Sequence, residues 1–394
     1  MAKKPNIRFA GFEDDWEQRK LGEVCVRVTR KNKNNESDLP LTIASQYGLI
    51  DQRDFFNKVI AAKDMSNYYL LKKGEFAYNK SYSKGFDYGS IKRLNVYEQG
   101  CLSTLYICFS IETDEVDSDY LECFFDTLSW YHDVSAICAE GARNHGLLNV
   151  DVKAFFKDVN IEMPSQIQEQ RKISVFINTI DHLITLHQRK CDELKKVKKF
   201  MLQKMFPKKG EKNPEIRFDG FTNDWEQRKL GDVVEFLDTM RKPLEGAKRI
   251  SGPYPYYGAS GIVDYVDGYL FDEELVLLSE DGANITDRNY PVCFLASGKY
   301  WVNNHAHVLK TKDGNENNFI CNSLERKDYK QYNSGMAMPK LNQEVCRGIP
   351  ISCPSFDEQK KIGDYFSNLD HLITLHQCKC KSCKKYYKCT RKLK

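Results

Sequence analysis

One helical segment occurs twice in this chain, and its length constrains the fold more than any other feature. It reads EQRKISVFINTIDHLITLHQRK from Glu169 and EQKKIGDYFSNLDHLITLHQCK from Glu358, and the octet DHLITLHQ is identical at Asp181 and Asp370. Apolar residues recur at spacings of three and four, which places them on one stripe of an α-helix. Each copy predicts a helix of about 35–40 residues, ~55–60 Å long. A stripe this long needs a partner helix, and the other copy is the obvious candidate.

A second repeat makes the whole chain a tandem duplication. Residues 6–24 read NIRFAGFEDDWEQRKLGEV and residues 215–233 read EIRFDGFTNDWEQRKLGDV. The interiors between these leaders and the helices share almost no recognisable sequence. Both have short strand patterns, such as those at 74–78 and 275–278, broken by Gly and Asn/Asp turns. Near-identical frames around divergent interiors favour a constant scaffold that presents two recognition surfaces.

Length and composition set the number and class of domains. A chain of 394 residues exceeds one ordinary core, and an apolar content of 41% is globular rather than disordered. The expected divisions are a first globular domain at 1–164, a long helix and hinge at 165–213, a second globular domain at 214–354 and a second long helix at 355–394. Fourteen cysteines without an apolar signal segment favour free thiols in the cytoplasm, and no apolar run reaches the ~18–20 residues of a membrane span.

The net charge of +4 is unevenly distributed, because lysines concentrate on the two helices. A basic helix pair suits a polyanion or an acidic partner surface. A solvated lysine face is an equally good interpretation. After His376 the second helix also loses the apolar quality of the first, which predicts weaker helix pairing near its end.

The frame and the interiors resemble one known family. The leader RF-x-GF-x-x-DWEQRKLG and the two DHLITLHQ helices resemble those of the DNA-specificity subunit of type I restriction-modification systems. The second interior resembles that family's target-recognition domains in YPYYGASGIV from Tyr254, LSEDGAN from Leu278, WVNNHAH from Trp301 and SGMAMPKLN from Ser334. The first interior has a looser version in FAYNK from Phe76, GSIKR from Gly89 and EGARNHG from Glu140.

The resemblance implies an α+β fold in which two globular α/β target-recognition domains are separated by two long helices. The helices would form an antiparallel coiled coil with a pseudo-two-fold internal duplication. The chain would be a non-catalytic reader of double-stranded DNA, each domain binding one half of a bipartite, asymmetric sequence. The helices would dock methyltransferase (modification) subunits. S-adenosylmethionine, ATP and Mg would be bound by those subunits and by restriction/translocase subunits, with no cofactor on this chain and no membrane partner.

Polar residues in the Gly-rich turns are the candidates for DNA contact. Asn and Gln can pair with adenine in two places, and Arg and Lys with guanine. In the first interior the candidates are Lys80, Ser81, Tyr82, Lys84, Arg143, Asn144 and His145. In the second they are Tyr257, Ser260, Asp281, Asn284, Asn303, Asn304, His305 and Lys340. Turns that serve only the shape of the chain are the alternative.

Catalytic and metal-binding patterns are weak, so we assign no catalytic residue and no metal ligand. The sequence has no G-x-x-x-x-G-K-[ST] loop for ATP and no Asn-Pro-Pro-Tyr-like run for an amino-methyltransferase. The carboxylates at 272–274 and 280–281 leave open a stand-alone restriction or modification enzyme. A coiled-coil adaptor that never binds DNA is a further alternative.

The histidines and cysteines do not form a recognisable metal-binding pattern. The four cysteines at 378–389 lie on one predicted helix and lack the paired spacing of a zinc site. His305 and His307 would share one face of a strand, but no third ligand is evident. His187 and His376 fall on the apolar stripe, where we expect a hydrogen-bonded polar layer that sets the helix register.

Overall fold

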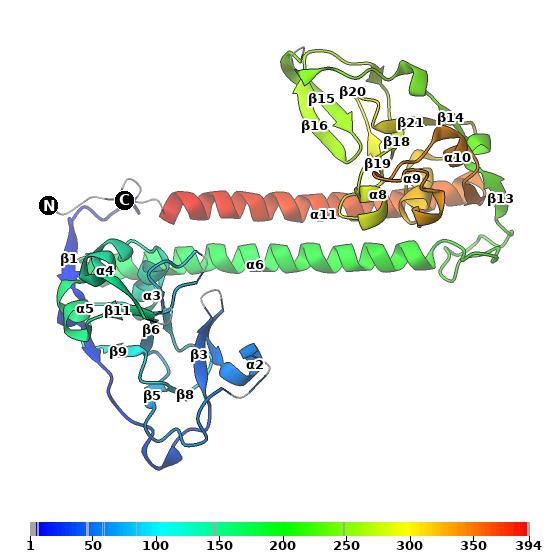
Figure 1. The fold of residues 1–394 in the computed structure, drawn as a ribbon. Helices are drawn as coiled ribbons and strands as arrows, with labels where there is room; N and C mark the ends of the chain where they lie inside the picture. The colour runs from blue at the N-terminus through cyan, green and yellow to red at the C-terminus, as the bar shows by residue number, and fades with distance from the viewer. Residues whose placement is uncertain are drawn as a thin grey trace. The chain divides into compact units, whose positions relative to one another are not determined.

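The chain forms two compact units, each built on one copy of the leader. The computed structural model describes the backbone of residues 5, 8–44, 47–56, 58, 60–83, 85–144, 147–246 and 249–391, and its side chains apart from those of 139–147 and 388–391. Unit 1 comprises Met1–Thr185 with Lys381–Lys394, and unit 2 comprises Leu186–Cys380 (Figure 1). The two long helices are divided between the units.

The elements of unit 1 run from the leader to the first long helix. In chain order they are β1 (Trp16–Lys20), α1 (Leu21–Val24), β2 (Cys25–Arg27), η1 (Lys33–Asn35), β3 (Leu41–Ala44), β4 (Gly48–Asp51), α2 (Gln52–Phe56), β5 (Tyr69–Lys72), β6 (Phe76–Asn79), β7 (Ser90–Arg93), β8 (Gln99–Leu102), β9 (Ile107–Ile111), α3 (Ser118–Asp126), α4 (Tyr131–Ile137), β10 (Cys138–Asn144), β11 (Leu147–Val150), α5 (Val152–Asp158), β12 (Asn160–Pro164) and the first part of α6 (Ile167–Lys204).

The elements of unit 2 follow the rest of α6. They are β13 (Glu226–Lys229), α7 (Leu230–Val233), β14 (Val234–Phe236), η2 (Asp238–Met240), β15 (Ser251–Gly258), β16 (Gly261–Val266), β17 (Phe271–Asp272), β18 (Leu275–Ser279), α8 (Asn284–Asp287), β19 (Cys293–Ala296), β20 (Lys299–Val302), β21 (Ala306–Thr311), α9 (Asn317–Glu325), η4 (Lys330–Tyr332), α10 (Gln343–Arg347), β22 (Pro350–Cys353) and most of α11 (Phe356–Arg391). The α+β class predicted from the sequence is confirmed.

The two units share one strand topology although their interiors differ in sequence. A four-stranded sheet has the order β2-β9-β6-β7 in unit 1 and β14-β21-β18-β19 in unit 2. The leader strand pairs with the strand before the long helix in both, as β1 with β12 and β13 with β22. The pairs β3–β4 and β5–β8 likewise have counterparts in β15–β16 and β17–β20. The duplication therefore extends from the leaders to the fold.

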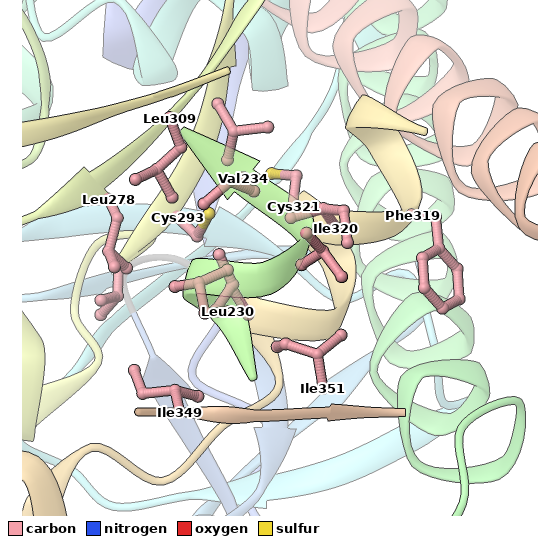
Figure 2. Packing of buried hydrophobic residues seen from close by; sticks show 14 of the residues in the cluster. Leu230, Val234, Leu278, Cys293, Leu309, Phe319, Ile320, Cys321, Ile349 and Ile351 are labelled. Carbon is pink, nitrogen blue, oxygen red and sulfur yellow. The ribbon is translucent and has the colours of Figure 1, made fainter. Parts of the chain in front are cut away.

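The central strand β18 shows how the core of unit 2 is built. All of its residues are buried, as the apolar run at 275–278 predicts for a strand covered on both faces. Val276 and Leu278 pack with Leu309 and Phe319 in one cluster, part of which Figure 2 shows. Leu277, which points to the opposite face, belongs to a second cluster around β20 and β21. The sheet is thus enclosed between two apolar layers.

An arginine–glutamate pair ties each leader to the start of its long helix. Arg8 binds Glu169 through two hydrogen bonds of 2.7 and 2.8 Å, and Arg217 binds Glu358 through two of the same lengths. Both glutamates are nearly inaccessible to solvent. Bidentate pairing satisfies the buried carboxylates, which would otherwise be costly to remove from water. These paired contacts explain why the leader and the helix start are the repeated parts of the sequence.

The next helix residue makes a second duplicated contact. Gln170 accepts a hydrogen bond from the Asp117 N–H at 2.8 Å, and Gln359 accepts one from the Glu316 N–H at 3.1 Å. The carboxylates of Asp117 and Glu316 in turn cap α3 and α9. Each long helix is therefore fixed to an equivalent helix of its own unit.

The lengths of the long helices, 38 residues for α6 and 36 for α11, agree with the sequence prediction. Within unit 2 the end of α6 runs antiparallel to α11. His187 faces His376 with 3.0 Å between their Nδ1 atoms, and Lys198 binds Asp370 at 2.7 Å. The predicted histidine layer is therefore present, while coiled-coil packing in the strict sense stays a prediction.

Candidate nucleic-acid interface

Four segments of unit 2 converge where β18 ends and β21 begins. These strands are antiparallel neighbours, so the end of one lies beside the start of the other. In the segment after β18, the Glu280 carbonyl accepts a hydrogen bond from the Leu341 N–H at 2.7 Å, and the Glu280 N–H donates to the His305 carbonyl at 2.9 Å. The Ser279 hydroxyl donates to the Ala259 carbonyl in the β15–β16 turn. The four motifs of the second interior therefore form one cluster of turns.

Charged side chains of opposite sign connect these turns. His305 Nδ1 lies 2.8 Å from an Asp281 carboxylate oxygen, and Lys340 Nζ lies 3.4 Å from Glu280 Oε1. Arg241 donates to Glu280 Oε2 at 2.7 Å and to the Ala306 carbonyl at 2.8 Å. Arg241 thus bridges the segment after β18 and the turn before β21. Sequence reasoning missed it, because it follows a short apolar strand and belongs to no motif.

His307 is a buried charged residue beneath this cluster. Its Nδ1 lies 2.6 Å from Asp238 Oδ2 and its Nε2 lies 2.8 Å from the Leu341 carbonyl. Both partners are acceptors, so both ring nitrogens must carry hydrogen, as in imidazolium. Burial alone would lower the pKa of His307, but the hydrogen bond with Asp238, reinforced by Cys346, raises the pKa to about 10. Burial would raise the pKa of Asp238, which His307 and Arg241 instead hold below its usual value.

The prediction that His305 and His307 share one strand face is wrong. The strand β21 begins at Ala306, so His305 lies in the preceding turn and is exposed. His307 points into the core because it is the second residue of a strand buried on both faces. In the part of the chain that the structure describes, no three His, Cys, Asp or Glu side chains are grouped to hold a metal ion.

The candidates of unit 2 differ in how accessible they are. Ser260, Asn304, His305 and Lys340 are exposed, and Tyr257 and Asp281 are half-buried. Asn284 and Asn303 are buried, and each makes a hydrogen bond inside the unit. The Asn284 amide donates to the Ser279 hydroxyl at 2.9 Å, and the Asn303 side-chain oxygen accepts the His305 N–H at 2.8 Å. Contact of these two asparagines with a base stays a prediction that their burial does not favour.

Unit 1 has an equivalent cluster of turns with different side chains. The Lys80 carbonyl, which follows β6, accepts the Leu148 N–H at 2.9 Å, just as Glu280 accepts Leu341. A turn at 103–106 precedes β9, and there the Leu105 N–H donates to the Ser103 hydroxyl at 3.3 Å. Sequence reasoning missed this turn because it has no Gly or Asn. Its signal is a Ser-Thr pair shortly before a buried strand.

The remaining candidates of unit 1 are only partly described. Lys80 and Ser81 are half-buried and Tyr82 is exposed, and burial lowers the pKa of Lys80. Arg143 and Asn144 pair with Leu148 and Leu147 in the β10–β11 hairpin. The Leu148 contact joins this hairpin to Lys80, so the segments predicted around 80 and 143 lie together. Lys84 and His145 are outside the described residues.

The chain is similar in sequence to known proteins. Residues 222–382 match the type I restriction modification DNA specificity domain. The type I restriction enzyme specificity subunit S.HindORF215P of Haemophilus influenzae is 36% identical over 156 residues, 40% of this chain and 40% of that protein. The MjaVIII specificity subunit of Methanocaldococcus jannaschii is 25% identical over 273 residues, 59% of this chain and 60% of that protein. Residues 222–382 therefore carry a type I restriction modification DNA specificity domain, and the chain is similar to specificity subunits of type I restriction enzymes.

The likeness in fold extends over nearly the whole chain. The crystal structure of a type I restriction-modification S subunit from M. genitalium matches with a TM-score of 0.66 and covers 99% of this chain and 98% of that one. The identity is 14%, so this likeness concerns the fold alone. The sequence matches span about two fifths to three fifths of the curated relatives. Among the described residues, no helix has both the length and the apolar character needed to span a bilayer.

Proposed function

We propose that this chain is a specificity subunit that reads a bipartite, asymmetric sequence in double-stranded DNA, one half with each cluster of turns. The observation that carries the proposal is the chemical difference between equivalent positions. Lys80 of unit 1 corresponds to Glu280 of unit 2, and Leu105 corresponds to His305. A carboxylate accepts from the amino group of cytosine, whereas lysine donates to guanine. The two units have the same strand topology but carry different side chains at equivalent positions of their turns, which supports two different half-sites. A palindromic target would contradict the proposal.

We further propose that the subunit has no catalytic role and docks adenine methyltransferase subunits on its helices. Support comes from exposed apolar side chains on α6, where Val175 and Phe176 in unit 1 and Val197 and Phe200 in unit 2 are all at least 42% exposed. Exposed apolar stripes of this kind are typical of surfaces that a partner covers. S-adenosylmethionine would be bound by the methyltransferase, and ATP and Mg by restriction/translocase subunits.

The test is methylome sequencing of cells that co-express the chain with a modification subunit. We expect adenine methylation at one motif with two unlike halves. Asn304→Ala and His305→Ala should relax or abolish recognition of one half only, because both side chains lie at the edge of unit 2. His132→Ala removes an exposed histidine of unit 1 and should leave recognition of the half-site read by unit 2 unchanged. Loss of both halves together in the unit 2 variants would contradict separate reading.

The two rival functions make opposite predictions. A stand-alone enzyme would cut DNA with Mg²⁺ or bind S-adenosylmethionine as the purified chain, and we expect neither. A coiled-coil adaptor would not bind DNA at any salt concentration. A DNA reader should lose affinity steeply as salt rises, because bound phosphates release counterions.

A further inference from the structure

A short loop of unit 2, residues 333–340, is closed at its base by hydrogen bonds. The Asn333 side-chain oxygen accepts the Gly335 N–H at 2.9 Å and the Lys340 N–H at 2.8 Å. The Ser334 N–H donates to the Lys340 carbonyl at 2.9 Å, which closes the two ends a second time. The loop base is therefore braced by contacts within the loop itself.

The path of the loop tip requires glycine at its start. A Cβ added to Gly335 would lie 1.8 Å from the Met338 carbonyl oxygen. No side chain can occupy that space, so the chain folds back on itself directly after Gly335. The tip GMAMP is consequently a tight turn with a fixed direction rather than a loose excursion.

Two methionines stand at this tip. Met336 is fully exposed and Met338 is 61% exposed. Single apolar side chains on a surface are ordinary, but these two sit on a braced turn that holds them in water. Such an arrangement stabilises nothing in the free protein, which indicates that a ligand covers them.

The neighbours of the tip identify the chemistry of that ligand. The Gly282 N–H donates to the Pro339 carbonyl at 3.1 Å, and Asp281 and Lys340 form a backbone bridge. The loop base therefore lies among charged groups, since Asp281 also binds the exposed His305. A protein partner would favour a continuous apolar patch, whereas a base stack offers flat apolar faces bordered by polar edges and phosphates.

We infer that the loop inserts Met336 between stacked base pairs in the half-site read by unit 2. This inference rests on the proposed function and adds a wedge to it. Apolar side chains that enter base steps unstack them and distort the duplex. Methionine is unbranched and carries a polarizable thioether, so it can lie flat against a base. Gly335 and Asn333 are the positioning residues that aim it.

The experiment uses the full chain with its modification subunit and duplexes that carry the methylated motif. 2-Aminopurine is placed at each step of the unit 2 half-site except the methylated adenine. Wild-type protein should raise the fluorescence at one step, because unstacking relieves quenching. Met336→Ala should abolish that rise and weaken binding roughly tenfold. Met336→Leu should keep both the fluorescence rise and the affinity of the wild type. Met240→Ala, which truncates a half-exposed methionine outside the loop, should behave as wild type.

Three outcomes separate the inference from the proposed function. If wild-type protein does not bind the motif, both are overturned. If it binds but no step shows a Met336-dependent rise, the wedge alone is overturned. A third outcome is that replacing a thymine by uracil weakens binding as much as Met336→Ala does, while wild-type protein raises the fluorescence at no step. Met336 would then contact a thymine methyl in the groove, and the wedge would again be overturned.

Discussion

Replacing His307 by glutamine should remove a charge that stabilises unit 2 and titrates far above the usual range of histidine. The imidazole is 1% exposed and lies between the Asp238 carboxylate and the Leu341 carbonyl. Its pKa is about 10 in the folded chain, against an ordinary value of 6.5. The folded state thus holds this proton more tightly than the unfolded state. The resulting stabilisation is complete below pH 6.5 and is lost as the pH rises toward 10.

One pKa unit corresponds to about 1.4 kcal/mol, so the advantage of wild type over His307→Gln should shrink by about 3 kcal/mol between pH 7 and pH 9. That is a large part of the ~5–15 kcal/mol of a typical domain. Urea unfolding of both proteins at pH 6, 7, 8 and 9 measures the difference. His305→Gln changes an exposed histidine two residues away, and its difference from wild type in unfolding free energy should stay nearly constant over this pH range. A constant difference over this range would refute the assignment of a charged His307.

Three further predictions concern the frame, the loop and the core. Arg217→Ala should lower the free energy of unfolding by about 3–5 kcal/mol because it leaves the buried Glu358 without a partner, and adding Glu358→Leu should restore part of it in urea unfolding. Gly335→Ala should disturb motif recognition in methylome sequencing but change the melting temperature little, since the clash with the Met338 carbonyl is confined to an exposed loop. Leu278→Ala should cost about 2–5 kcal/mol by calorimetry, because the residue is fully buried between β19 and β21.

The sequence predicted those parts of the fold whose signal is local and periodic. The long helices follow from apolar residues spaced three and four positions apart, and β18 follows from an uninterrupted apolar run. Several candidate segments do lie where strands end, as Gly, Asn and Asp predict, but Arg143 and Asn144 belong to β10, Tyr257 to β15 and Asn284 to α8. Their contact with DNA stays a prediction. Partners distant in sequence could not be predicted. His307 resembles an exposed polar residue until Asp238, 69 positions away, is placed beside it.

The contacts that hold the two clusters of turns explain how one scaffold can carry different side chains at equivalent positions. In unit 2 the Leu341 N–H binds the Glu280 carbonyl, and in unit 1 the Leu148 N–H binds the Lys80 carbonyl. Both contacts use only main-chain atoms, which every residue except proline can supply. A change of side chain at 80 or 280 therefore keeps this main-chain contact, although at 280 it also removes the bonds of Glu280 with Arg241 and Lys340. The leaders and helix starts are held by side chains instead, and they are the parts that remain alike between the two copies.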